Sequence, residues 1–326
     1  TMTYLENSKQ YTGSDLENIF FRPMLTGESA QDLGVRVLYN MPQPTHVQLW
    51  DGQRNILQKF TSAGWAGGKA ATKYEKTVNL NRVKAELGFS AANYFSMVYE
   101  KVSSLVNTHM DDLSGTELEQ AETALFKQAL AENIRVTMWI GDTSAASGYN
   151  TFDGLLKRIN GLVDDDGVYN FSYQAAALED PAYAVELFDK LWAGADPRIP
   201  GLKADDRLAY FVSSDIYRLY EKYLDAKGAD AAYADAMNGR RTLAYHGIPV
   251  VDVRLGSYLG ATSFRQSFVM LTDRRNLVLA VNTADMPGNE VRMWYNPDEM
   301  ENRQRAVFMA GTQILDEALI SFAYKQ

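Results

Sequence analysis

The sequence contains no cysteine and only three histidines, so it lacks the usual side chains of metal and thiol chemistry. Without cysteine the chain can form no disulfide, thiolate metal site or cysteine nucleophile. His46, His109 and His246 lie far apart, and no two of them have the spacing of a metal-binding pair on one helix. We therefore expect no catalytic site, no metal and no cofactor built on these residue types.

Positive charge and long apolar runs are also scarce. Lysine and arginine number 32 against 41 aspartates and glutamates, which gives a net charge of −9. Such a balance argues against tight binding of nucleic acid phosphates. No apolar run approaches the roughly 20 residues that cross a bilayer, so no membrane segment is expected. Hydrophobic residues still make up 46% of the chain, which is enough for an ordinary packed core.

The N-terminal 40 residues are polar, with isolated apolar clusters. Ser14 and Glu17 have the spacing of a capping box, which predicts a short helix through "DLENIFF" that ends at Pro23. Phe20 and Phe21 in this segment are too apolar for a free tail. They pack either on the core of the chain itself or, as part of an extended arm, on a neighbouring subunit.

Residues 41–78 predict a long β-hairpin. Alternating residues in "THVQLWDGQRNILQKF" indicate two strands joined at Asp51-Gly52, and the small residues of "SAGWAGGKAATK" follow. A long hairpin of this kind has little chance of burying both faces in its own domain, so it projects, lies on a partner, or is an ordinary peripheral hairpin. In the first two cases the aromatic contact residues are Trp50, Phe60 and Trp65.

The strongest helix signal runs from Thr116 to Asn133. Its predicted apolar stripe, with the residues that widen it, consists of Leu118, Ala121, Leu125, Phe126, Ala129 and Leu130. The next stretch, "MWIGDTSAASGYNTFDGLLKRI", resembles a strand, a phosphate-binding loop and a helix. However, Gly141 to Gly148 has the wrong spacing for a Walker loop, no lysine follows, and the dinucleotide fingerprint is missing. A ligand-binding protein or enzyme that uses the Gly141–Gly148 loop is therefore only an alternative interpretation.

Residues 161–284 predict an α/β or α+β domain. Asp180 is expected to cap one helix and Ser213 or Ser214 another, while "DRRN" is expected to be a hairpin tip between two strands. The aspartates of "VDDDG" lack the spacing of a calcium loop and predict a solvated turn. The C-terminal residues predict strands that return to pair with the first half of the chain. No convincing active site emerges.

The order of these features resembles the major capsid protein of tailed bacteriophages, the Hong Kong 97 fold that encapsulin shells share. The resemblance covers nearly the whole chain. It includes a "W-x-G-D … F-x-G-L" element and a "G-x-P-V" element. The residues of the two elements are Trp139, Gly141, Asp142, Phe152, Gly154, Leu155, Gly247, Pro249 and Val250.

The resemblance implies an α+β chain divided into named parts. These are an N-terminal arm (1–40), an E-loop hairpin (41–78), a peripheral domain (79–160 and 285–326) with spine helix 116–133, and an axial domain (161–284). It also implies a structural protein without catalysis. Many copies would form hexamers and pentamers of an icosahedral head, with Phe20, Phe21, Trp50, Phe60 and Trp65 as assembly contacts.

The implied surroundings follow from that role. The head encloses double-stranded DNA without sequence-specific binding and is assembled in the bacterial cytoplasm. A portal, and scaffolding or decoration proteins, are the expected partners. An encapsulin-type compartment shell is the alternative within the same fold. Lys69, Lys73 and Lys76 lie where some members form covalent crosslinks, but none matches that pattern and no crosslink is predicted.

Overall fold

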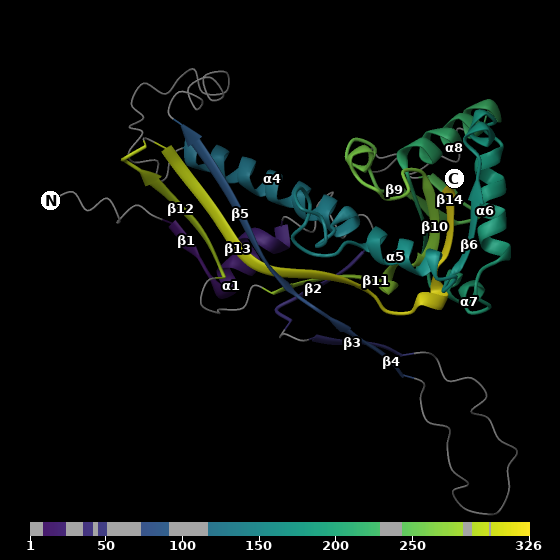
Figure 1. Cartoon of the computed structure of the whole chain (residues 1–326), viewed down its shortest axis with the longest axis horizontal. Coiled ribbons are helices and arrows are strands. Elements are labelled where there is room, and N and C mark those ends of the chain that lie inside the picture. The colour runs from purple at the N-terminus through teal and green to yellow at the C-terminus, as the bar shows by residue number, and fades with distance from the viewer. Residues whose placement is uncertain are drawn as a thin grey trace, which may run out of the picture.

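The computed structural model describes residues 9–23, 35–41, 45–50, 73–90, 117–228, 243–282, 289–299 and 301–326. Within these ranges the strands form two six-stranded sheets and a separate two-stranded hairpin. Figure 1 shows the sheets toward opposite ends of an elongated body, with the hairpin strands extending away from it. The mixture of sheets and helices confirms the predicted α+β class.

The first sheet joins strands from both ends of the chain. Its order is β1-β12-β13-β11-β2, and β5 also pairs with β13. Strand β13 changes neighbours along its length, pairing with β12 and β5 in its first part and with β11 in its second. The predicted return of the C-terminal strands to the first half is therefore confirmed. The bounds are β1 Lys9–Tyr11, β2 Arg36–Tyr39, β5 Asn81–Ser90, β11 Leu277–Asn282, β12 Glu290–Asn296 and β13 Glu301–Ile314.

The second sheet has the order β6-β14-β10-β7-β9-β8. Its central strands β7 and β10 are buried at every residue, which explains their continuous apolar sequences. Its strands are β6 Tyr169–Tyr173, β7 Leu208–Val212, β8 Leu243–Tyr245, β9 Ile248–Asp252, β10 Phe268–Asp273 and β14 Ser321–Lys325. The longer helices are α4 Glu117–Ile140, α5 Leu155–Asp164, α6 Tyr183–Ala193, α7 Ile199–Lys203 and α8 Ser214–Ala226. The short helical turns are α1 Gly13–Asp15, η1 Leu16–Phe21, η2 Ala175–Glu179, η4 Leu259–Ala261, η5 Arg274–Asn276 and η6 Glu317–Leu319.

The chain crosses between the sheets through α4 and α5, from β5 to β6, and again at two short neighbouring turns. Strand β10 lies in the second sheet and β11 in the first, so "DRRN" between them is a crossover and its prediction as a hairpin tip is wrong. Strand β13 lies in the first sheet and β14 in the second. The predicted ranges 161–284 and 285–326 therefore each contain one strand of the other sheet. Sequence position could not reveal this, because pairing partners are set by long-range contacts.

The main hydrophobic core lies between the sheets. It combines one face of the second sheet, through residues such as Phe211 and Phe268, with Leu279 and Phe308 of the first, and with α4 and α5. A second core fills the other face of the second sheet under α6, α7 and α8. Alternate residues of one strand thus enter different cores, as Phe211 and Tyr210 of β7 do.

Helix α4 confirms the predicted helix and extends it by about two turns, through the run that resembled a strand. Residues 134–140 are all buried, so this part has no solvent-facing polar side and no helical stripe to recognise. In the preceding turns the buried face consists of Phe126, Leu130 and Ile134, at four-residue spacing. Leu125, placed at the centre of the predicted stripe, is 37% exposed.

Candidate functional site

The glycine-rich segment after α4 is a closed structural junction. The Gly141 amide donates to the Thr137 carbonyl at 2.8 Å, and the Gly154 amide donates to the Gly141 carbonyl at 2.8 Å. A Cβ atom on Gly154 would lie 2.6 Å from the Trp139 carbonyl oxygen, and one on Gly141 would overlap the Phe152 carbonyl oxygen. Both positions require glycine because two backbone segments touch there.

The amides of residues 141–145, at the start of this loop, are already hydrogen-bonded within the protein. The amides of Thr143 and Ser144 donate to the carboxylates of Asp153 and Asp142, each at 2.9 Å. Lys157 forms ion pairs of 2.7 Å with both aspartates. The Lys157 hydrogen bond, helped by Ser144, lowers the pKa of Asp142 from its ordinary 3.8 to about 2. A phosphate would need these amides free and would meet two carboxylates, so the geometry does not favour a phosphate site.

The same loop is fixed to the first sheet. The Thr312 hydroxyl of β13 donates to the Asp153 carbonyl at 2.5 Å, and the Asn81 side chain of β5 donates to the Thr151 carbonyl at 3.2 Å. Trp139 and Phe152 on either side of the loop are buried in the main core. The "W-x-G-D … F-x-G-L" residues therefore form one packed unit that joins α4, α5 and the first sheet.

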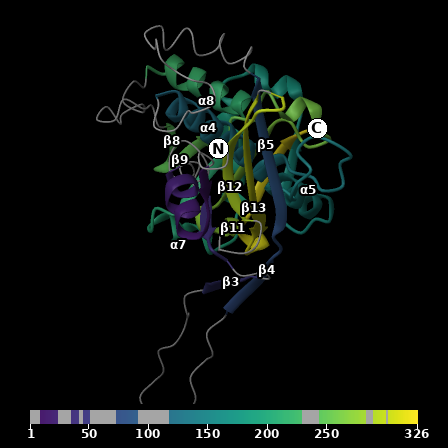
Figure 2. The same cartoon turned by 90° about the vertical axis from the view of Figure 1, so that its left-hand side faces the viewer.

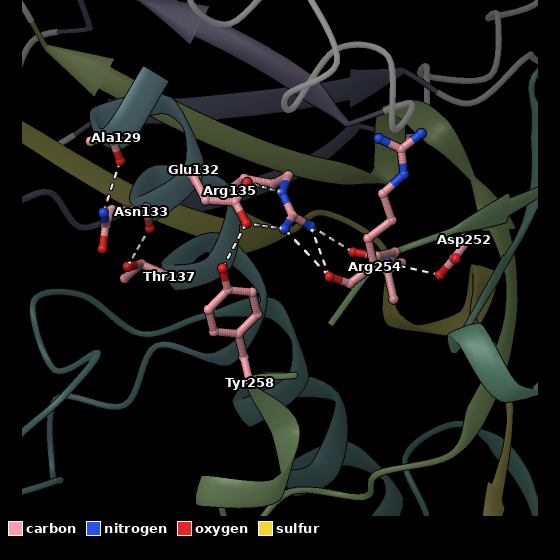
Figure 3. Close-up of polar contacts among 9 residues, drawn as sticks. Ala129, Glu132, Asn133, Arg135, Thr137, Asp252, Arg254 and Tyr258 are labelled. Carbon is pink, nitrogen blue, oxygen red and sulfur yellow. Dashed lines mark hydrogen bonds and ion pairs between the residues drawn. The ribbon is translucent and has the colours of Figure 1, made fainter. Parts of the chain in front are cut away.

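A buried arginine clamps α4 to the segment that follows β9. The Arg135 side chain is 7% exposed, and its Nη1 donates to the Val253 carbonyl at 2.8 Å. Glu132 accepts from Arg135 at 3.0 and 2.6 Å and from the Tyr258 hydroxyl at 2.9 Å. Figure 3 shows Arg135 and Tyr258 converging on Glu132. The Arg135 hydrogen bond is the main cause of a lowered Glu132 pKa. The clamp attaches the helix over the first sheet to a loop of the second.

The structure corrects two of the predicted assembly contacts. Phe20 and Phe21 are fully buried within the chain, where Phe20 packs on Tyr11 and Phe21 packs edge-on against Phe308 of β13. Of the two interpretations left open, the chain's own core is correct. The "DLENIFF" helix exists, as α1 and η1, but Ser14 lies inside it rather than at its cap.

The three remaining predicted contacts belong to the hairpin. Trp50 is the last residue of β3 (Thr45–Trp50), but its side chain is not among those described, and Phe60 and Trp65 lie outside the described residues. Strand β3 pairs with β4 (Lys73–Val78), from Thr45 opposite Val78 to Trp50 opposite Lys73. The strand expected to follow Asp51-Gly52 at once is therefore not its partner, and the hairpin spans a longer range.

The root of this hairpin has a small core of its own. Val47, Val78 and Leu80 pack with Val278 and Ala280 of β11 and with Leu315. Strand β11 directs its other residues into the main core. Figure 2 shows the hairpin strands continuing from this root away from the body. The root is anchored on the first sheet, and the strands beyond it point outward.

The other predicted polar positions have structural roles. Asp164 of "VDDDG" forms a 2.7 Å ion pair with Arg265, and Asp180 accepts a hydrogen bond from the Ala182 amide just before α6. Ser213 precedes α8 without a side-chain cap, and the Ser214 hydroxyl donates to Asp252 at 2.8 Å. Within the described ranges no group of three or more histidines and carboxylates is arranged to hold a metal. None of the helices in these ranges has the length and apolar character to cross a membrane.

Sequence reasoning did not predict that Arg135 and Arg198 each hold distant segments of the chain together through side-chain hydrogen bonds. Arg135 does carry a signal, since it is the one charged residue in the apolar run "IRVTMWI". A charge in such a run needs a buried partner. Arg198 lies between two polar turns and gives no comparable signal.

Comparison with solved structures decides the fold. No family model matches the chain, and no curated protein matches its sequence. A chain of the satellite phage P4 procapsid structure, which includes the size determination (Sid) protein, matches with a TM-score of 0.57 and 8% identity, covering 93% of this chain and 97% of that one. The chain has a phage-capsid fold. The predicted resemblance to the Hong Kong 97 fold is thus confirmed at the level of fold.

Other phage structures align with the same capsid fold less closely. A Gordonia phage Cozz chain aligns at a TM-score of 0.48 and 10% identity, covering 91% of this chain and 86% of that one. A capsid chain of the cyanophage P-SCSP1u aligns at 0.47 and 10%, covering 91% and 88%. Such low identities carry no residue roles across to this chain.

Proposed function

We propose that this chain is the major capsid protein of a tailed bacteriophage, a structural subunit that assembles into an icosahedral head around double-stranded DNA. The observation that carries the proposal is the whole-chain match to a procapsid chain, which leaves little of either chain unaligned. The glycine loop, whose Thr143 and Ser144 amides are bonded to its own carboxylates, also weakens the ligand-binding alternative. The proposed role is structural, without catalysis.

The parts of the subunit follow from this role. The hairpin 41–78 would lap over adjacent subunits, with Trp50, Phe60 and Trp65 as contacts. The described parts of the predicted arm, 9–23 and 35–40, instead pack in the subunit's own first sheet and core. The second sheet with its helices would serve as the axial domain around the axes of hexamers and pentamers. The first sheet and α4 would serve as the peripheral domain and spine helix. A portal and scaffolding or decoration proteins complete the proposed partners, in a head assembled in the host cytoplasm.

The net charge of −9 suits a shell that surrounds DNA without gripping it. Like charges on the lining and on the phosphates repel, which keeps packaged DNA mobile. No observation favours the encapsulin-type compartment over the phage head.

Size-exclusion chromatography with negative-stain microscopy of the purified chain tests the proposal. Large hollow particles or capsomer rings are expected. A clean monomer or dimer that binds a nucleotide would refute it. Deletion of residues 50–65 should leave a subunit with an unchanged circular dichroism spectrum that no longer assembles. If that deletion unfolds the chain, the hairpin is part of the core and its assignment is wrong.

A further inference from the structure

The two short crossovers between the sheets are bonded to each other by a buried polar pair. Asn276 ends the β10–β11 crossover and is fully buried, and Asp316 starts the β13–β14 crossover and is 6% exposed. The Asn276 side chain accepts from the Asp316 amide at 2.7 Å and donates to the Asp316 carbonyl at 2.8 Å. We name residues 315–319 the crossing turn. A rotation of one sheet against the other at these two turns would strain this bonded pair.

The crossing turn is also held by the helices of the second sheet. Arg198, just before α7, donates from Nη1 to the Asp316 carboxylate at 2.7 Å. Its Nε donates to Asp196 at 2.9 Å, and its side chain is only 19% exposed. The two carboxylates raise the pKa of Arg198, so the guanidinium stays charged and its bonds remain charge-assisted.

The hairpin root holds the same turn from the other side. Lys76 of β4 forms an ion pair with Glu317, and the Gln313 side chain donates to the Thr77 carbonyl at 2.8 Å. Leu315 packs in the root core with Val78. Three consecutive residues therefore have three different partners. Leu315 packs in the root core, Asp316 binds Arg198 before α7, and Glu317 binds Lys76 of β4.

We propose that the crossing turn couples the position of the β3–β4 hairpin to the angle between the two sheets. The turn is short and its residues are bonded on both sides, so the hairpin root and α7 cannot shift independently without breaking charge-assisted bonds. The coupling belongs to the single subunit and does not depend on the proposed function. Its consequence in a shell does rest on that function: a neighbour that displaces the hairpin would bias the angle between the sheets.

Hydrogen–deuterium exchange of the full-length chain tests the coupling, with all variants compared in the same assembly state. Arg198→Met should accelerate amide exchange in β4, on the far side of the crossing turn, by about threefold or more. Lys76→Met should reciprocally accelerate exchange in α7, and Lys76→Arg, which keeps the charge, should not. Tyr245→Phe is the control, because it breaks the 2.7 Å hydrogen bond from β8 to Asp189 of α6 within the second sheet and its helices and leaves the crossing turn intact.

Two outcomes would overturn the coupling. One is acceleration confined to α7 and the crossing turn in Arg198→Met. The other is an equal effect on β4 from Tyr245→Phe. If Arg198→Met does not fold, Lys76→Met decides the matter, since Lys76 is 36% exposed and its loss leaves the cores untouched. These readouts need no shell, so a failed assembly assay does not alter them.

Discussion

Replacing Gly154 with alanine should destabilise the subunit, because two backbone segments touch at this position. The added Cβ would lie 2.6 Å from both the Gly141 nitrogen and the Trp139 carbonyl oxygen, which are backbone atoms that cannot rotate away. Overpacking of this kind costs about 1–3 kcal/mol. Displacement of the 2.8 Å Gly154–Gly141 hydrogen bond adds about 1 kcal/mol. We therefore expect a loss of about 3 kcal/mol.

Urea unfolding followed by tryptophan fluorescence measures this loss. With an m-value of about 3 kcal/mol per molar, the midpoint should fall by about 1 M. Gly161→Ala is the matched control, because Gly161 lies within α5, is exposed and has nothing within 4 Å of an added Cβ. That substitution should stabilise the chain by about 0.5–1 kcal/mol. Equal urea midpoints for Gly154→Ala and Gly161→Ala would show that the close contact between Gly154 and Gly141 does not constrain residue 154.

Three further substitutions test separate parts of the argument. Asp142→Asn should reduce the loss of unfolding free energy that the chain shows between about pH 4 and pH 2. The depressed pKa of Asp142 gives stability that is present above about pH 4 and lost as the pH falls towards 2. An unchanged loss over this pH range, measured by urea unfolding, would contradict this. Phe21→Ala should lower the unfolding free energy by about 3–5 kcal/mol in unassembled subunits; a purely assembly-dependent defect would restore the neighbour-contact interpretation. Arg135→Met should cost about 2 kcal/mol by leaving the Val253 carbonyl unpaired, and an unchanged denaturation midpoint would refute the clamp.

Much of the element content was readable from local pattern. The helix from residue 117 has an apolar stripe on one side and charged residues on the other. The buried strands of the second sheet are short apolar runs bounded by turns. The hairpin was located correctly, but its pairing was wrong, since 22 residues separate the end of β3 from the start of its real partner β4. Local alternation cannot distinguish an adjacent partner from a distant one.

The errors share one physical cause. The end of α4, residues 134–140, is buried on all sides, so the helical period that identifies a surface helix is absent. Phe20 and Phe21 lacked a visible partner because Phe308, which packs against Phe21, comes almost three hundred residues later. Arg135 and Arg198 became structural centres only through carbonyls and carboxylates that distant segments bring to them.

The sequence by itself determined that disulfide and thiolate chemistry is unavailable, where most of the helices and strands lie, and the order of features that resembles a capsid subunit. These depend on composition and on short-range periodicity. Only the tertiary structure decided which sheet each C-terminal strand joins, why Gly141 and Gly154 must be glycine, and that one turn meets the hairpin, α7 and both crossovers. Those facts depend on contacts between residues far apart in the chain, which no local pattern encodes.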